Sequence, residues 1–176
     1  MTKWTIVHGN ILEQKADVLV VSANPQLNLS GGVGGAFMAR YGVEMQNQLH
    51  ELLDGKDVSF VQQGEVICMP ALNSPYKAVL HAVGIDVFYD SNADVIRATI
   101  ERALQTAASI DANSVALTAI ATGYGRVTWQ TFANGLLPIL DRDFQPIEDV
   151  YICVSKMESI DELARQLPMV SIDKPD

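Results

Sequence analysis

NPQLNLSGGVGGAFMARYG, residues 24–42, passes from a polar loop through a glycine-rich turn into an apolar segment. Val33, Phe37 and Tyr41 recur at the spacing of one helical face, and Gly42 predicts the end of that helix. Glycine lets backbone N–H groups approach a ligand without a Cβ in the way, and the positive end of the helix dipole points to the same place. The stretch therefore predicts a strand-to-helix turn that can bind phosphate, with a plain flexible turn as the alternative.

Strands and helices alternate on both sides of this turn. Short runs rich in β-branched residues predict strands at 4–9, 16–23, 64–70, 76–84, 114–122 and 149–155. Apolar residues at helical spacing predict helices at 33–42, 45–55, 93–110, 128–137 and 159–167. The central strands are apolar throughout, which is typical of strands buried on both faces. We therefore expect an α/β fold, a three-layer α/β/α sandwich with a mixed, mostly parallel sheet.

The length of 176 residues and the absence of any linker or repeat predict a single domain over residues 1–169. The last stretch, 170–176, is short and polar, and we expect it to be frayed. No apolar run is long enough to cross a membrane, and the first residues do not resemble a secretory signal, so a cytoplasmic location is expected. Cys68 and Cys153 lie in apolar, strand-like surroundings, which predicts two reduced core thiols.

The formal net charge of −9 disfavours a long nucleic acid as a partner, because no cluster of Lys and Arg offsets the repulsion. It does not exclude a small anionic ligand held by backbone N–H groups. A second candidate for such a loop is ATGYGRV, residues 121–127, after the apolar run SVALTAI. In an open α/β sheet both turns would lie at the ligand crevice, where they would form a diphosphate clamp. Neither standard nucleotide motif is present, since no Lys follows the glycines and Phe37 stands where a dinucleotide fold needs Gly.

Three segments in the expected order resemble the macrodomain family. They are HGNILEQKADVLVVSANPQLNLSGGVGGAFMARYG (8–42), GEVICMPALNSPYKAVLHAVG (64–84) and ALTAIATGYG (116–125). The similarity spans about Val7 to Leu140, and the short T-G-x-G form of the second loop is similar to that of a bacterial subgroup. The resemblance implies binding of ADP-ribose, either free or attached to a protein. No cofactor and no metal are expected.

The resemblance also implies which residues contact the ligand. By position these are Asn10 and Ile11 beside the adenine, Asn24 at the distal ribose, Gly32, Val33, Gly34 and Gly35 in the first phosphate loop, and Thr122, Gly123, Tyr124 and Gly125 in the second. Tyr124 would pack near the diphosphate, or serve only as an aromatic residue of the turn. Asn24 is the candidate catalytic residue.

Three positions depart from the family pattern. Asn10 replaces the Asp that accepts a hydrogen bond from the adenine amino group, which predicts weaker adenine recognition, because charge-assisted bonds are stronger than neutral ones. Ser155 stands where many relatives have an adenine-stacking aromatic, for which Phe144 or Tyr151 could substitute. Gly34 replaces the loop Asp of the mono-ADP-ribosyl hydrolase branch, which makes hydrolysis less expected without excluding it.

Other candidate sites are weaker. The three histidines show no metal-ligand spacing, and His81 is expected to be a hydrogen-bonded core residue. Asp86 and Asp90 could orient a water, although acidic loop residues are usually just solvated. Three functions stay open: binding of ADP-ribose or a similar nucleotide; hydrolysis of ADP-ribosyl or O-acetyl-ADP-ribose esters through Asn24 and a loop-bound water; and a degenerate macrodomain that acts as an interaction module. The oligomeric state is not indicated.

Overall fold

The computed structural model describes residues 1–123 and 125–173. In this part of the chain, seven strands form one sheet in the order β3-β4-β2-β5-β6-β1-β7. The strands are β1 (Lys3–His8), β2 (Val18–Ser22), β3 (Val66–Pro70), β4 (Ala78–Ala82), β5 (Ser114–Thr118), β6 (Asp149–Val154) and β7 (Ser171–Asp173). Only the β3–β4 pair is antiparallel among these strands, which confirms the mixed, mostly parallel sheet.

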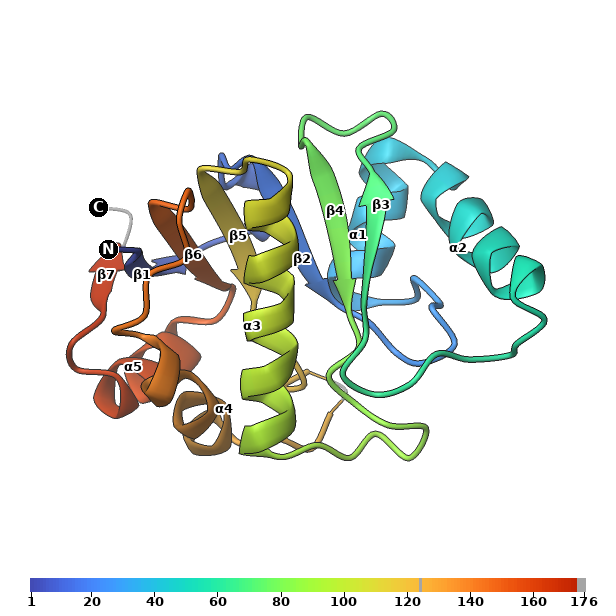
Figure 1. Cartoon of the computed structure of the whole chain (residues 1–176). Coiled ribbons are helices and arrows are strands. Elements are labelled where there is room, and N and C mark those ends of the chain that lie inside the picture. Colours follow the sequence, from blue (N-terminus) through green and yellow to red (C-terminus); the bar gives the residue numbers. More distant parts are fainter. Residues whose placement is uncertain (124, 174–176) are drawn as a thin grey trace.

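Helices cover both faces of the sheet (Figure 1). In the described residues they are α1 (Gly32–Tyr41), α2 (Glu44–Gly55), α3 (Ala93–Ser109), α4 (Trp129–Leu136) and α5 (Met157–Gln166), with 3-10 turns η1 (Ile11–Glu13) and η2 (Leu137–Ile139). Leu19 and Val21 of β2 pack under α1 and α2, whereas Val18 and Val20 pack under the other three helices. Because side chains alternate along a strand, a fully apolar β2 can fill both cores.

The C-terminal stretch differs from its prediction. Ser171–Asp173 form β7 and pair in parallel with residues 5–7 of β1, so the expectation of a frayed tail is wrong for these residues. All three are exposed, so little apolar burial supports the strand. We attribute the formation of β7 to the edge of β1, whose backbone N–H and C=O groups would otherwise lack hydrogen-bond partners in the sheet. Residues 174–176 lie outside the described residues.

The predictions for two polar residues of the core, Cys68 and His81, also need correction. Cys153 is buried, and burial raises the pKa of its thiol to about 12, but Cys68 is exposed on the edge strand β3. His81 is buried as expected, and burial lowers its pKa to about 4. Among the described residues, however, neither of its ring nitrogens has a hydrogen-bond partner. It lies in register between Val21 and Ile67, two members of the apolar cluster under α1 and α2.

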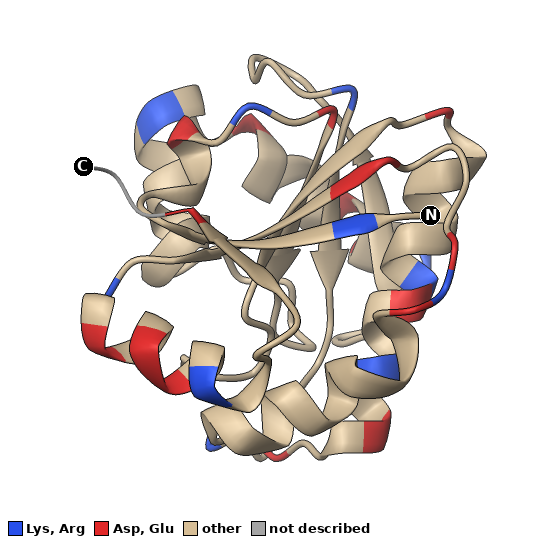
Figure 2. Cartoon of the chain, turned by 90° about the vertical axis from the view of Figure 1, so that its left-hand side faces the viewer, with Lys and Arg blue, Asp and Glu red and all other residues tan. Residues whose placement is uncertain are grey.

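The charged residues do not form a basic surface on the side that carries the termini. There, Lys and Arg are scattered among acidic positions (Figure 2), in keeping with 12 basic against 21 acidic residues overall. Of the helices in the described part of the chain, none has the length and apolar character needed to cross a bilayer.

Candidate functional site

The site predicted from the sequence lies along one edge of the sheet. Six of the described strands run parallel, β4, β2, β5, β6, β1 and β7, so their carboxyl ends share that edge. The segments that leave these ends include residues 9–10, 23–31, 83–92 and 119–128. An open α/β sheet binds its ligand in the crevice outside this edge. All the predicted contact residues within the described part of the chain belong to three of these segments or directly follow them.

Side chains tie the two glycine-containing loops together at their base. Backbone pairing of β2 with β5 reaches Val20 and Leu117. Beyond that point the Ser22 N–H donates to Thr118 Oγ1 at 3.0 Å, and the Ala121 N–H donates to Ser22 Oγ at 3.4 Å. These bonds place the segment after β5 beside the segment after β2. The sequence reading missed both hydroxyl residues, although a polar residue at the end of an apolar strand is the signal that could have found them.

The first loop presents unpaired amides at the start of α1. Gly31 and Gly32 have φ values of 66° and 51°, a left-handed backbone that favours glycine. Within the described residues no side chain caps this helix at Gly31, and the first helical bond runs from Gly35 N to Gly31 O at 2.9 Å. The N–H groups of the first turn are therefore left without helical acceptors, which is the arrangement that binds anions.

Gly34 is packed closely against the loop that precedes it. A Cβ at this position would lie 3.1 Å from Leu29 Cα and 3.3 Å from Leu29 Cδ2. The Leu29 backbone is itself held, because its N–H donates to Gln46 Oε1 at 2.6 Å. An Asp at residue 34 would require Leu29 to shift by a few tenths of an ångström. Gly34, which replaces the Asp of the hydrolase branch, is thus packed too closely against Leu29 for an Asp to fit without a local shift.

The second loop is a tight turn. Thr122 donates from Oγ1 to Ala119 O at 2.7 Å, and Ala121 has a φ of 67°. Gly125 is buried, and a Cβ there would stand 2.2 Å from Ala121 O, so a larger residue would force this turn open. Gly123 is exposed at the turn. Tyr124 lies outside the described residues.

Asn24 directly follows the buried Ala23 after β2 and holds the loop that leads to α1. Its Nδ2 donates to Asn28 O at 2.9 Å, and its Oδ1 accepts from Asn28 N at 3.0 Å. An amide nitrogen carries two N–H groups, so one remains for a ligand. The Asn28 side chain continues the network, because its Oδ1 lies 2.9 Å from His50 Nε2 of α2.

Asn10 and Ile11 lie at the far end of the same edge. Asn10 is exposed and caps η1, since its Oδ1 accepts from Leu12 N at 3.0 Å. Ile11 is only 4% exposed and belongs to the cluster under α1 and α2. β1 lies three positions from β2 in the sheet, a distance of about 14 Å at ordinary strand spacing. A ligand that touches both Asn10 and Asn24 must therefore be elongated.

The two suggested substitutes for an adenine-stacking aromatic do not lie at this edge. Phe144 precedes β6, is buried, and donates from its backbone N to Thr2 Oγ1 at 2.9 Å, which places it near the amino ends of β1 and β6. Tyr151 lies in the middle of β6, opposite Thr5 and Ala116. That hypothesis is wrong for Phe144 and has no support for Tyr151. Ser155 directly follows β6 and is exposed at the carboxyl edge.

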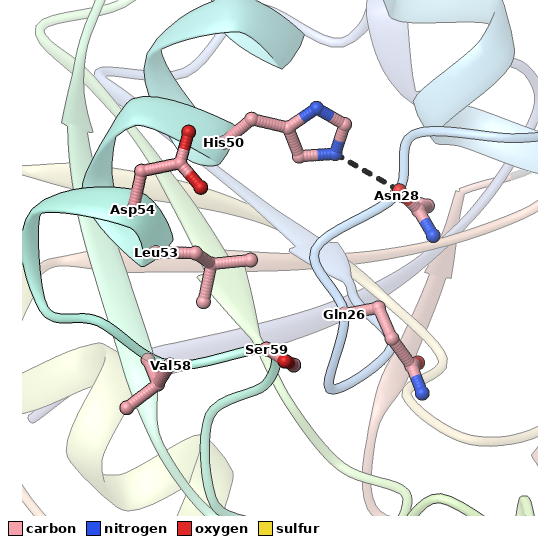
Figure 3. Close-up of a pocket in the computed structure, with 7 residues that line it drawn as sticks. All are labelled: Gln26, Asn28, His50, Leu53, Asp54, Val58 and Ser59. Atoms are coloured by element: carbon pink, nitrogen blue, oxygen red, sulfur yellow. Dashed lines mark hydrogen bonds between the residues drawn. The ribbon is translucent and has the colours of Figure 1, made fainter.

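Two cavities lie beside the site and not between the glycine loops. The larger, about 410 Å³, is lined by the loop after β2 and by α2 (Figure 3). The smaller, about 210 Å³, is lined by Pro25, the connection between α2 and β3, and Asp86 with Val87. Asp86 Oδ1 accepts from the N–H groups of Phe88 and Asp90 and so shapes its own loop. No group of three or more metal-ligating side chains occurs in residues 1–123 and 125–173.

Comparison with known proteins shows which family this sequence resembles. The macro domain family model matches residues 20–135. An O-acetyl-ADP-ribose deacetylase of Enterobacter cloacae is 34% identical over 131 residues, which cover 68% of this chain and 67% of the relative. A macro domain-containing protein of Streptomyces nogalater is 27% identical over 95% of this chain and 93% of its own length.

Solved structures share the fold. An Oceanobacillus iheyensis macrodomain variant with ADPR superimposes with a TM-score of 0.82 at 21% identity, over 93% of this chain and 91% of that one. A Trypanosoma brucei macrodomain in complex with ADP-ribose has a TM-score of 0.74 at 19% identity, over 92% of this chain and 68% of that one.

Proposed function

The chain belongs to the macro domain family, and on that premise we propose that it binds ADP-ribose along the carboxyl edge of its sheet. The observation that carries the proposal is the uncapped start of α1, joined through Ser22 and Thr118 to the loop after β5. Backbone N–H groups of the first loop would bind the diphosphate. The separation of Asn10 from Asn24 suits an elongated dinucleotide-like ligand, with adenine near Asn10 and the distal ribose near Asn24.

A second candidate function is hydrolysis of an ester at the distal ribose, and the relative named O-acetyl-ADP-ribose deacetylase favours it. The free N–H of Asn24 could orient the substrate, and a water held by the first loop could attack the ester carbonyl. Release of acetate from O-acetyl-ADP-ribose, compared between the wild-type protein and Asn24→Ala, tests this function. Equal rates in both proteins and in buffer would remove it and leave binding as the function.

A carboxylate placed at the start of α1 tests the binding proposal. Gly32 has a left-handed φ that Asp tolerates better than most residues, and a Cβ there meets nothing within 4 Å, so Gly32→Asp should fold. We expect titration calorimetry to show ADP-ribose affinity at least about tenfold weaker, because the new charge repels the diphosphate where the amides would bind it.

The matched control is Ala39→Asp near the other end of the same helix. Ala39 is exposed and has an ordinary helical backbone, and the rise of α1 separates it from Gly32 by about 10 Å. Its affinity should stay within about twofold of the wild type. Equal weakening by both variants would contradict the assigned loop. An absence of binding by the wild-type protein would favour the degenerate interaction module.

A further inference from the structure

Two cavities lie beside the site, and we call them together the lateral groove. Their linings adjoin along the chain at Pro25 and Gln26 and again at Ser59 and Phe60. The groove residues are Pro25, Gln26, Asn28, His50, Leu53, Asp54, Val58, Ser59, Phe60, Val61, Gln62, Gln63, Asp86 and Val87. The groove thus runs from α2, along the loop after β2, to the loop after β4.

The wall of the lateral groove is built on the candidate site itself. Pro25 and Gln26 directly follow Asn24, and Asn28 is bonded to Asn24 through both of its backbone polar groups. His50 Nε2 lies 2.9 Å from Asn28 Oδ1 (Figure 3). The same ring nitrogen lies 3.0 Å from Gln46 Nε2. This network fixes one end of the groove next to the residue that we assign to the distal ribose.

The chemistry of the lateral groove fits a polypeptide with basic side chains. Two lining residues, Asp54 and Asp86, carry carboxylates, and none of the lining residues given above is Lys or Arg. In the described part of the chain, the Gln26 amide and the Ser59 hydroxyl have no hydrogen-bond partner, so they can bind peptide groups. Phe60 is 45% exposed and offers an apolar surface. Opposite charge across an interface selects the partner and steers its approach.

From these observations we propose that the lateral groove binds a basic segment of the protein to which ADP-ribose is attached. The inference rests on the proposed function, because the ADP-ribose must lie in the crevice for its distal ribose to reach Asn24. It also goes beyond that function, because none of the residues that line the groove is among those assigned to ADP-ribose itself. The preferred ligand is therefore an ADP-ribosylated protein with Arg or Lys near the modified residue.

Two ADP-ribosylated peptides of equal length test this inference, one with Arg and Lys around the modified serine and one with Glu and Asp. We expect calorimetry to show that the basic peptide binds about five- to tenfold more tightly than free ADP-ribose, whereas the acidic peptide does not. Asp54→Lys should abolish this advantage and leave free ADP-ribose unaffected. Asp54 is exposed in the last turn of α2, where a Lys is favourable for the helix dipole.

The control for the change in net charge is Glu162→Lys. Glu162 is exposed on α5, on the other face of the sheet, and the substitution changes the formal charge by the same amount. This variant should keep the preference for the basic peptide. Equal affinity of the wild-type protein for both peptides, or an equal loss in both variants, would overturn the inference while leaving ADP-ribose binding intact. If free ADP-ribose also fails to bind, the proposed function fails instead.

Discussion

At the scale of single residues, the two asparagines assigned to the ends of the ligand also hold local backbone. The Asn10 side chain caps η1 by accepting from Leu12 N. The Asn24 side chain is hydrogen-bonded to both the backbone N–H and the backbone C=O of Asn28. Truncation of either side chain would therefore disturb its loop as well as remove the proposed ligand contact. A substitution that keeps the acceptor oxygen separates the two effects.

Asn10→Asp is such a substitution, because a carboxylate caps a helix start as well as a carboxamide does. We expect it to tighten ADP-ribose by up to about tenfold, since a charged acceptor for the adenine amino group adds about 1 kcal/mol. Calorimetry with ADP-ribose measures the change. The hypoxanthine analogue, which lacks the amino group, should gain nothing. An unchanged affinity for ADP-ribose would show that adenine is recognised elsewhere.

At this scale the glycine turns of the candidate site were predictable from the sequence, and the wrong predictions, those for the core residues Cys68 and His81, share a cause. The turns at Gly32 and Gly125 could be predicted because a backbone conformation or a close contact that needs glycine leaves a local pattern in the sequence. The exposure of Cys68 and the unpartnered ring of His81 depend on which strand lies at the edge and on what packs across the sheet. Neither property can be predicted from the neighbouring residues in the sequence.

At the scale of elements, apolar periodicity predicted the long helices and the central strands, because their burial depends on a repeating pattern. The boundaries followed local chemistry as well. Thr128 caps α4 at the start of the predicted helix, with Oγ1 accepting from Thr131 N at 3.1 Å. The short η1 and β7 were missed, since three residues carry too little pattern, and β7 depends on the free edge of β1.

The junction of β2 and β5 carries a prediction at this scale. Thr118→Val keeps the shape of a buried side chain and removes the acceptor for Ser22 N. We expect a loss of about 1–2 kcal/mol in the free energy of unfolding, together with weaker ADP-ribose binding, because the two loops are no longer held at their base. Denaturant unfolding and calorimetry measure the two effects.

Thr99→Val is the matched control for that substitution. Thr99 is fully buried in α3 and donates to Val95 O at 2.7 Å, so its replacement also removes one hydrogen bond from a buried threonine. It should lower stability and leave the affinity for ADP-ribose unchanged. If both variants weaken binding in proportion to their loss of stability, the β2–β5 junction has no special role in the site.

At the scale of the whole molecule, the layers were predictable and the order of the strands was not. Apolar strands that alternate with amphipathic helices predict a covered, mostly parallel sheet. The order β4-β2-β5-β6-β1 decides that Asn10 and Asn24 lie at opposite ends of the crevice. That order is set by pairings between strands far apart in the sequence, such as β2 with β5 and β1 with β6, which only the folded chain shows.

The net charge of −9 leads to a prediction about salt. The chain as a whole repels an anionic ligand, and added salt screens that repulsion over a Debye length, whereas amide contacts of about 3 Å are hardly screened. We therefore expect the affinity for ADP-ribose to stay constant or rise as NaCl increases from about 0.05 to about 0.5 M. A site that depends on cationic side chains would show the opposite trend.

Arg126→Gln removes the exposed cation at the end of the second loop and should keep the same salt response. A steep fall in affinity with salt, lost in Arg126→Gln, would show that this side chain and not the backbone binds the diphosphate.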